Sequence, residues 1–315
     1  MRILALVPGA ISDQILFFPT IEGLKAQFPQ SQIDVVVEPR AKSAYGLCKS
    51  VRDTVIFDFQ GRNSLADWGN LLGMIRDREY QVALSFDDRW STGLLLWLSG
   101  IPTRVGAAKG PSELYMTNSV VLDSAKLSTS KRYYSVLKSL SISEPCQDPI
   151  VNIPAKDLEW ADVERRRLGV KAGGYVLICG QGDETEASYP AEQWRTVIQD
   201  FQKKQPDMPI VLADRVSGGW ISSLTQSFPS LKVTKPVSLG QTVALFAGAS
   251  LSLCCEGPEM HLAAASKSFT LALLSSTSDP KKLLPQTDRV IGIKSPSPQI
   301  SDISPSMILE KIWGG

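Results

Sequence analysis

Short apolar or β-branched runs alternate with longer amphipathic stretches along the first half of the chain. Ile3–Val7 and Ile33–Val37 are predicted strands, and a helical pattern from about Ile15 to Phe28 separates them. Two more strands are predicted at Thr54–Phe57 and Val82–Phe86, with an amphipathic helix between them. Nearly continuous apolar strands separated by helices indicate a parallel sheet that is covered on both faces.

The same pattern restarts in the second half of the chain. Residues 141–155 contain three prolines and little periodicity, which is typical of a linker. The sequence therefore predicts two doubly wound α/β domains, residues 1–150 and residues 151–315, with a binding cleft between them. The elements predicted for the second domain are helices at Lys156–Leu168, Ala191–Lys203 and Pro305–Trp313, and strands at Tyr175–Cys179, Ile210–Ala213, Leu251–Cys255 and Phe269–Leu274.

Composition narrows the range of partners. Lys and Arg total 33 against 32 for Asp and Glu, so no overall positive field collects nucleic acid, and an anionic ligand needs a local site. The five cysteines form no CxxC pair and have no zinc-ligand spacing with the single histidine, His261. We therefore expect reduced core thiols, no metal site and a cytosolic protein.

The chain has no apolar run long enough to cross a bilayer. A spanning helix needs about 18 or more apolar residues, and the stretch around Leu94–Leu98 is much shorter. The apolar stretch within residues 1–7 is broken by Pro8 and Gly9, which predicts a first strand rather than a signal peptide. We expect a cytoplasmic protein whose contact with a membrane, where it occurs, is peripheral and at the inner face.

Three loops that follow predicted strands are candidate ligand sites, because ligands of open α/β sheets bind at the carboxyl ends of the strands. The first, Pro8–Asp13, opens a helix. Asp13 there is either a general base that accepts a proton from a substrate hydroxyl or a residue that caps the helix. The loop alone leaves both roles open.

The second and third loops are candidates for phosphate binding. Gly180 and Gln181 begin the second loop, where glycines allow close backbone approach, although its acidic residues oppose a phosphate and it matches no nucleotide-binding motif. The third loop, Glu256–His261, leads into an alanine-rich helix whose amino end offers N–H groups to an anion. His261 either binds a phosphate or ribose oxygen or is satisfied by local hydrogen bonds.

The order and spacing of these segments resemble glycosyltransferase family 9, the ADP-heptose lipopolysaccharide heptosyltransferases, over nearly the whole chain. The segment ISDQILFFPTI carries Asp13 and Pro19 where the family has an aspartate and an early helix proline. GIPTRVG, with Arg104, is similar to a later element that ends in Arg-Val-Gly. The most specific match is EGPEMHLAAASKSFTLALLSSTSDP, around His261.

This resemblance implies a GT-B fold of two Rossmann-like domains and a soluble enzyme of lipopolysaccharide biosynthesis. The implied reaction is an inverting, metal-independent transfer of a heptose-like sugar from a nucleoside diphosphate, with an ADP-sugar as donor. The acceptor would be a lipid-linked or cell-surface glycan. Asp13 would be the base, with Ser12 and Arg104 on the acceptor side, and the donor would contact Gly180, Gln181, Arg215, Glu256, Gly257 and His261.

Several positions depart from the family pattern. Ser12 replaces a glycine, and Ala187 stands where the family has a lysine. Gly257 and Pro258 replace a threonine and a glycine, which removes a hydroxyl and a backbone N–H. The alternative to an enzyme is therefore an inactive homologue that acts as a binding or assembly protein. A sugar-nucleotide epimerase shares the predicted architecture but not the His-Leu-Ala-Ala-Ala element.

Overall fold

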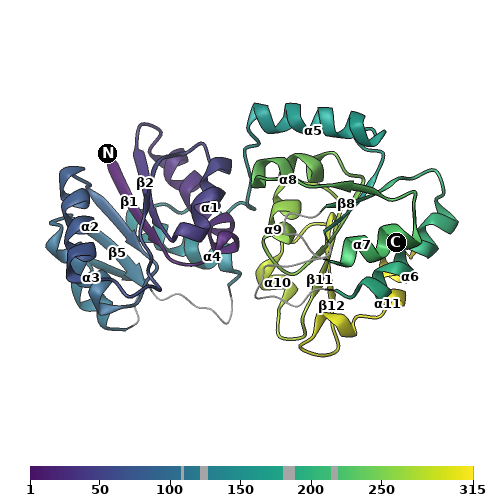
Figure 1. The fold of residues 1–315 in the computed structure, drawn as a ribbon. Coiled ribbons are helices and arrows are strands. Elements are labelled where there is room, and N and C mark those ends of the chain that lie inside the picture. The colour runs from purple at the N-terminus through teal and green to yellow at the C-terminus, as the bar shows by residue number, and fades with distance from the viewer. Residues whose placement is uncertain (108–109, 121–126, 180–188, 214–218, 315) are drawn as a thin grey trace. The chain divides into compact units, whose positions relative to one another are not determined.

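The chain folds as two compact units, Met1–Asn152 and Ile153–Gly315. The structure is a computed structural model that describes residues 1–107, 110–120, 127–179, 189–213 and 219–314 (Figure 1). The division between the units falls inside the proline-containing stretch predicted to be a linker. The cleft that the sequence predicts between the units stays a prediction.

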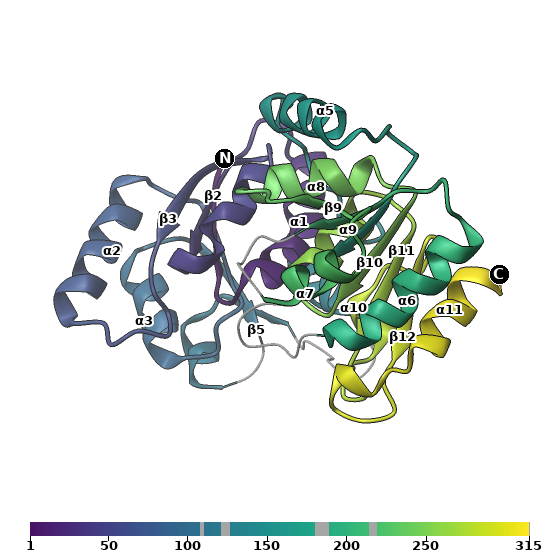
Figure 2. The same ribbon diagram turned by 45° about the vertical axis from the view of Figure 1, so that its right-hand side comes forward.

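The first unit is built on a six-stranded parallel sheet with the strand order β3-β2-β1-β4-β5-β6. Ile3–Val7 of the central strand are fully buried, as expected for a strand covered on both faces. Figure 2 shows the helices α2 and α3 together on one side of this sheet. The elements are β1 (Arg2–Val7), α1 (Ile11–Gln27), β2 (Gln32–Val37), η1 (Pro39–Leu47), β3 (Val51–Ile56), α2 (Leu65–Asp77), β4 (Val82–Ser85), α3 (Trp90–Leu98), β5 (Thr103–Ala107), η2 (Pro111–Tyr115), β6 (Asn118–Val120), α4 (Thr129–Tyr134) and η3 (Ser135–Leu140), where η marks a 3₁₀ helix.

The second unit repeats this topology. Its six-stranded parallel sheet has the order β12-β11-β10-β7-β8-β9, which is the strand order of the first unit read from the other edge. The elements are α5 (Ala155–Leu168), β7 (Val176–Cys179), α6 (Ala191–Lys204), β8 (Ile210–Ala213), α7 (Gly219–Ser227), β9 (Lys232–Thr234), α8 (Leu239–Ala247), β10 (Leu251–Cys255), α9 (Pro258–Ala265), β11 (Thr270–Leu274), α10 (Pro280–Leu283), β12 (Val290–Lys294), η4 (Ile300–Asp302) and α11 (Pro305–Trp313).

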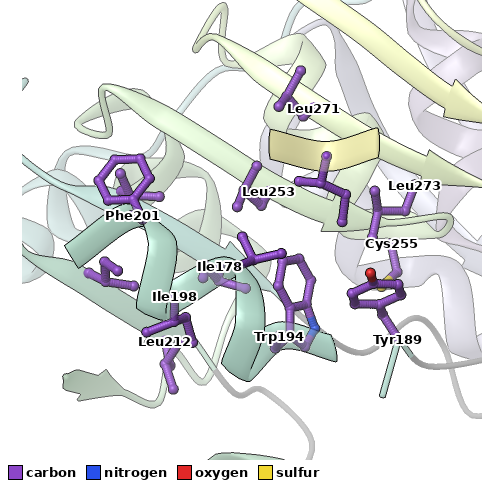
Figure 3. Packing of buried hydrophobic residues seen from close by; sticks show 14 of the residues in the cluster. Ile178, Tyr189, Trp194, Ile198, Phe201, Leu212, Leu253, Cys255, Leu271 and Leu273 are labelled. Carbon is purple, nitrogen blue, oxygen red and sulfur yellow. The ribbon is translucent and has the colours of Figure 1, made fainter. Parts of the chain in front are cut away.

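A buried aromatic pair anchors the second unit where α6 meets its sheet. The rings of Tyr189 and Trp194 pack edge to face with centroids 4.9 Å apart, beside Ile178 of β7 and Cys255 of β10 (Figure 3). The Tyr189 hydroxyl donates to the carbonyl of Ile303 at 2.8 Å, which ties the start of α6 to the C-terminal segment. The chain therefore enters α6 from a fixed point.

The repeated strand order confirms the predicted fold class and places one topological switch point in each unit. At such a point the connections that follow two adjacent parallel strands run toward opposite edges of the sheet, which opens a crevice at the carboxyl ends of those strands. The switch lies between β1 and β4 in the first unit and between β7 and β10 in the second. The loops that follow these four strands are the places to examine for a ligand site.

None of the helices in the described residues has the length and apolarity needed to cross a membrane.

Candidate functional site

The loop after β1 turns sharply at Gly9. Its φ of +121° is a conformation that side-chain-bearing residues rarely adopt. A Cβ at this position would lie only 2.7 Å from Cγ and 2.9 Å from Cβ of Asp13. The Gly9 N–H donates to the buried carboxylate of Glu38 at 3.2 Å, and Glu38 is paired with Arg40. The end of β2 therefore braces the loop from which Asp13 projects.

Asp13 stands in the first turn of α1 and is held by two hydrogen bonds. One carboxylate oxygen accepts the N–H of Ala10 at 2.9 Å, and the other accepts the hydroxyl of Tyr133 at 3.2 Å. An ionised carboxylate has about four acceptor sites, so two contacts leave capacity for a further donor. The Asp13 side chain is partly exposed, so the helix cap remains accessible to a ligand.

An aromatic cluster fixes the phenol that reaches Asp13. Tyr133 packs edge to face against Phe86, which follows β4, and against Phe17 of α1, with ring centroids 5.1 and 5.9 Å away. Burial raises the pKa of Tyr133 well above its usual value, and the charge of Asp13 adds to this shift. The phenol therefore stays protonated and remains a donor to Asp13 across the physiological pH range.

The sequence analysis missed a second charged pair at this switch point. Asp87 is buried and follows β4. Its carboxylate accepts hydrogen bonds from Nε and Nη2 of Arg89 at 2.9 Å and 2.6 Å. Thr92 donates to the same carboxylate at 2.7 Å. Arg89 also lies over the Phe59 ring at 5.6 Å. The signal was the Asp-Asp-Arg-Trp run directly after a predicted strand, which becomes informative once β4 is known to pair with β1.

The other two acceptor-side candidates lie in different places. Ser12 is next to Asp13 in the first turn of α1 and is partly exposed. Arg104 is near the amino end of β5, in register with Ala83 and through it with Leu4 of β1. Three residues of strand, about 10 Å, separate that level from the end of β1. Arg104 instead donates to the carbonyls of Ile101 and Tyr115, so it does not join the loop that holds Asp13.

In the second unit, Glu256 serves as a brace for the neighbouring loop. It directly follows β10, and its backbone N–H continues the ladder to Leu273 at 2.9 Å. Its carboxylate accepts the N–H of Ser275 at 3.0 Å and the hydroxyl of Ser278. The acidic side chain thus holds the turn after β11 beside the amino end of α9.

Gly257 and Pro258 together shape the entry into α9. Gly257 has φ 149° and ψ −170°, a combination that is essentially restricted to glycine. Pro258 occupies the first turn and supplies no N–H. The extended ψ of Gly257 suits a following proline, because proline disfavours a helical residue before it. The backbone conformation of Gly257 and the requirement of Pro258 for an extended preceding residue are therefore compatible.

His261 is a neutral side chain in a buried helix. Only 6% of its surface is exposed, and burial lowers its pKa to about 4. The imidazole is therefore uncharged near neutral pH and can offer one N–H donor but no positive charge. Every residue of α9 is buried, so the first turn of the helix packs against the rest of the unit.

Four positions of interest lie outside the described residues: Gly180, Gln181, Ala187 and Arg215. Their predicted roles stay predictions. Within the ranges that the structure describes, no group of three His, Cys, Asp or Glu side chains is arranged to hold a metal ion.

Two Rossmann-type units with candidate ligand loops at their switch points define the GT-B architecture of nucleotide-sugar enzymes. Comparison with protein families narrows this class. The model of glycosyltransferase family 9 (heptosyltransferase) matches residues 68–312, and the chain belongs to this family. The matched segment begins at Trp68, so the loop that holds Asp13 precedes it.

Solved structures share the whole fold. A family 9 glycosyltransferase from Veillonella parvula superposes with a TM-score of 0.82 at 17% identity, over 98% of this chain and 95% of that one. The E. coli heptosyltransferase WaaC with ADP gives 0.78 at 16% identity, over 99% of both chains. The TM-scores show that the fold is shared, and at identities this low the similarity shows the fold alone.

A curated relative matches a shorter stretch. Photosynthetic NDH subunit of subcomplex B 1 from Arabidopsis thaliana is 31% identical over 85 residues, which is 27% of this chain. The match spans only 18% of the length of that plant protein.

Proposed function

We propose that the chain is an inverting glycosyltransferase that works without a metal. It moves a heptose-like sugar from a nucleoside diphosphate, with an ADP-sugar as donor, to a hydroxyl of a lipid-linked or cell-surface glycan. Its place of action is the cytoplasm, at the inner face of the membrane. Family membership and the geometry around Asp13 support this proposal.

The reaction assigns one role to each unit. The acceptor hydroxyl oxygen forms a bond to the anomeric carbon of the donor while the bond from that carbon to the diphosphate oxygen breaks. Asp13 takes the proton from the attacking hydroxyl. The leaving diphosphate gains negative charge, which the N–H groups of Glu259 and Met260 in the first turn of α9 would offset. His261 would add a neutral donor.

The observation that most strongly supports the proposal is the pair of hydrogen bonds that the Asp13 carboxylate accepts. A residue that serves only as a helix cap needs one contact, the N–H of the residue before the helix. Asp13 makes that contact and also accepts a buried phenol from α4. The second contact fixes the direction of the carboxylate while the side chain remains accessible, which is the arrangement that a general base requires.

The chain offers a matched control for a test of Asp13. Asp67 has the same position in α2 and accepts the backbone N–H of Ser64 at 2.8 Å, in an exposed setting. Asp13→Asn keeps an acceptor oxygen but removes the basic carboxylate. We expect it to lower sugar transfer about 100-fold or more, whereas Asp67→Asn leaves transfer unchanged.

Calorimetry with ADP, GDP, UDP and their sugar conjugates supplies the second readout. Asp13→Asn should bind the nucleotides as the wild type does, because Asp13 acts on the acceptor. Equal transfer by Asp13→Asn and the wild type would remove Asp13 from the mechanism. Absence of binding to every nucleotide and nucleotide sugar would refute the transferase itself.

A second candidate function is that of a non-catalytic subunit of a larger assembly. Pro258 lacks an N–H where the family has glycine, and His261 carries no charge at neutral pH, so the donor loop offers weak support for a diphosphate. The plant relative is named as a subunit of a photosynthetic NDH subcomplex. This chain would likewise use its fold as a binding surface within a complex.

Native gel electrophoresis of gently solubilised extracts tests this candidate. A subunit would migrate with a large assembly and would dissociate only with denaturant, whereas a free enzyme would migrate as a 315-residue monomer or small oligomer. Migration as a monomer, together with nucleotide binding, would eliminate the assembly role.

A further inference from the structure

Helix α3 is apolar on both of its faces. Its nine residues, WSTGLLLWL, include no charged side chain. Leu95 and Leu96 are buried in the core of the first unit. On the outer face Trp90 and Trp97 are 57% and 54% exposed, and their seven-residue spacing puts them along one side of the helix. A helix that is apolar all round normally has a partner on each side.

The 3₁₀ helix η2 enlarges this exposed apolar surface. It lies directly on α3, because a Cβ on Gly93 would be 2.9 Å from backbone atoms of Ser112. The rings of Trp97 and Tyr115 have centroids 6.5 Å apart. Leu114 of η2 is 87% exposed. We call Trp90, Trp97, Leu98 and Leu114 the apolar patch.

Two arginines hold the border of the patch at the C-terminal end of α3. Arg76 of α2, the neighbouring helix in Figure 2, donates to the carbonyl of Leu98 at 3.1 and 2.6 Å. Arg104 donates to the carbonyl of Tyr115 at 2.8 Å. Neither arginine forms an ion pair with a carboxylate in the part of the chain that the structure describes.

The guanidinium groups retain donors for an anion. Each carries five N–H groups, and the carbonyl contacts occupy only some of them. The carbonyls that the two arginines contact belong to Leu98 of the apolar patch and to Tyr115, whose ring lies 6.5 Å from that of Trp97. Tryptophan prefers the boundary between lipid tails and headgroups, and arginine binds phosphate oxygens there.

We propose that the apolar patch docks the first unit on a bilayer that contains anionic phospholipid. Leu114 and the two tryptophans enter the boundary of the acyl chains, and Arg76 and Arg104 contact headgroup phosphates. The anchor residues of protein–protein interfaces usually fill pockets of the partner protein, whereas the side chain of Leu114 is 87% exposed and the patch is bordered by two arginines. The inference does not depend on sugar transfer.

Co-sedimentation of the full chain with vesicles tests the proposal. Vesicles of phosphatidylcholine alone are compared with vesicles in which about a third of the lipid is phosphatidylglycerol. We expect about 25-fold tighter binding to the anionic vesicles, since each arginine near such a surface contributes about fivefold. Added salt should weaken this binding. Arg76→Gln with Arg104→Gln keeps side-chain donors and should abolish the preference for anionic lipid.

A matched pair of variants isolates the apolar contribution. Leu114→Glu should weaken vesicle binding about tenfold or more, because it removes the aliphatic group that would enter the bilayer and adds a negative charge. Val237→Glu alters a residue of the second unit that is 85% exposed, and it should bind like the wild type. Both side chains are exposed, so the melting temperatures should stay close to that of the wild type.

Three results would overturn the proposal. The first is a wild-type chain that does not bind anionic vesicles at low salt. The second is an equal loss of binding in Leu114→Glu and Val237→Glu. The third is an oligomer that Leu114→Glu dissociates in the absence of lipid, because the patch would then be an interface between copies of the chain.

Discussion

The loop that presents Asp13 should be sensitive to a single methyl group at Gly9. Gly9→Ala should lower the free energy of unfolding for two reasons, backbone strain and a steric clash. A side-chain-bearing residue at φ +121° is strained by about 1–3 kcal/mol. The new Cβ would also lie within 2.9 Å of two carbon atoms of Asp13, so that carboxylate must rotate away.

Rotation of Asp13 breaks its hydrogen bond with the N–H of Ala10, which costs about 0.5–2 kcal/mol as loss of a helix cap does. The variant should therefore lose about 2–4 kcal/mol of unfolding free energy. The rotated Asp13 carboxylate should also lose its alignment with the Tyr133 hydroxyl. We expect transfer to fall at least as far as in Asp13→Asn, for a purely geometric reason.

Gly100→Ala is the matched control. Gly100 has a φ of +77°, and nothing lies within 4 Å of the position that its Cβ would take, so the alanine variant shows the effect of backbone strain alone. Urea titration read by hydrogen exchange of peptides from residues 1–27 and 90–107 measures both variants in one unit. Equal destabilisation at the two glycines would refute the steric argument at Gly9.

Three further predictions concern buried polar groups. Tyr133→Phe should cost about 0.5–1.5 kcal/mol of stability and shift the pH profile of transfer, which Phe17→Leu, a change without a hydrogen bond, should not shift. His261 has a pKa of about 4 when folded and about 6.5 when unfolded, so only the unfolded state gains a proton as the pH falls from 6.5 to 4. Wild-type stability should fall by up to about 3 kcal/mol across that interval in an acid titration, and His261→Gln should flatten the slope. Asp34→Asn should cost about 3–5 kcal/mol in urea unfolding, because Arg78 and Tyr80 donate to this buried carboxylate at 2.9 and 2.6 Å; an unchanged midpoint would show that the cluster contributes nothing.

Central strands were predictable because burial on both faces leaves an uninterrupted apolar run. Ile210–Ala213 and Leu251–Cys255 have the predicted bounds, and the predicted strand at Val82–Phe86 ends one residue early. The edge strand β3 overlaps the strand predicted at Thr54–Phe57, but the edge strands β6 and β9 were not predicted. The three residues of β6, Asn-Ser-Val, and of β9, Lys-Val-Thr, are too few and too polar to show a period, and pairing with a neighbour forms them.

The first helix shows how local chemistry displaces a boundary. The apolar pattern predicted a start near Ile15, and α1 begins at Ile11. Residues 11–14 extend the helix because Asp13 captures the Ala10 N–H, a signal carried by hydrogen bonding rather than by periodicity. Both roles considered for Asp13 therefore coexist in one side chain, as the structure shows for the cap and as we propose for the base.

The residues that contact Asp13 or lie near it in the candidate site could not be predicted from the sequence. Tyr133 lies 120 residues from Asp13, and no local pattern connects them. Asp87 and Arg89 became candidates only when the strand order placed β4 beside β1. Motif spacing identified the loops, but the contacts between segments distant in sequence required the fold.

The two switch points differ in what they would offer to the proposed sugar transfer. The first presents a carboxylate that is held in place and accessible. The second presents a helix end whose first residue, Pro258, has no N–H and whose histidine is neutral. Loss of one donor aimed at a developing charge costs about 2.7–4 kcal/mol, or about 100- to 1000-fold in rate. The part of this loss that acts only on the charge developing in the transition state lowers kcat and leaves KM unchanged. The first unit is therefore compatible with both candidate functions, a slow transferase and an inactive binding protein. The donor loop of the second unit is the part of the chain that distinguishes them.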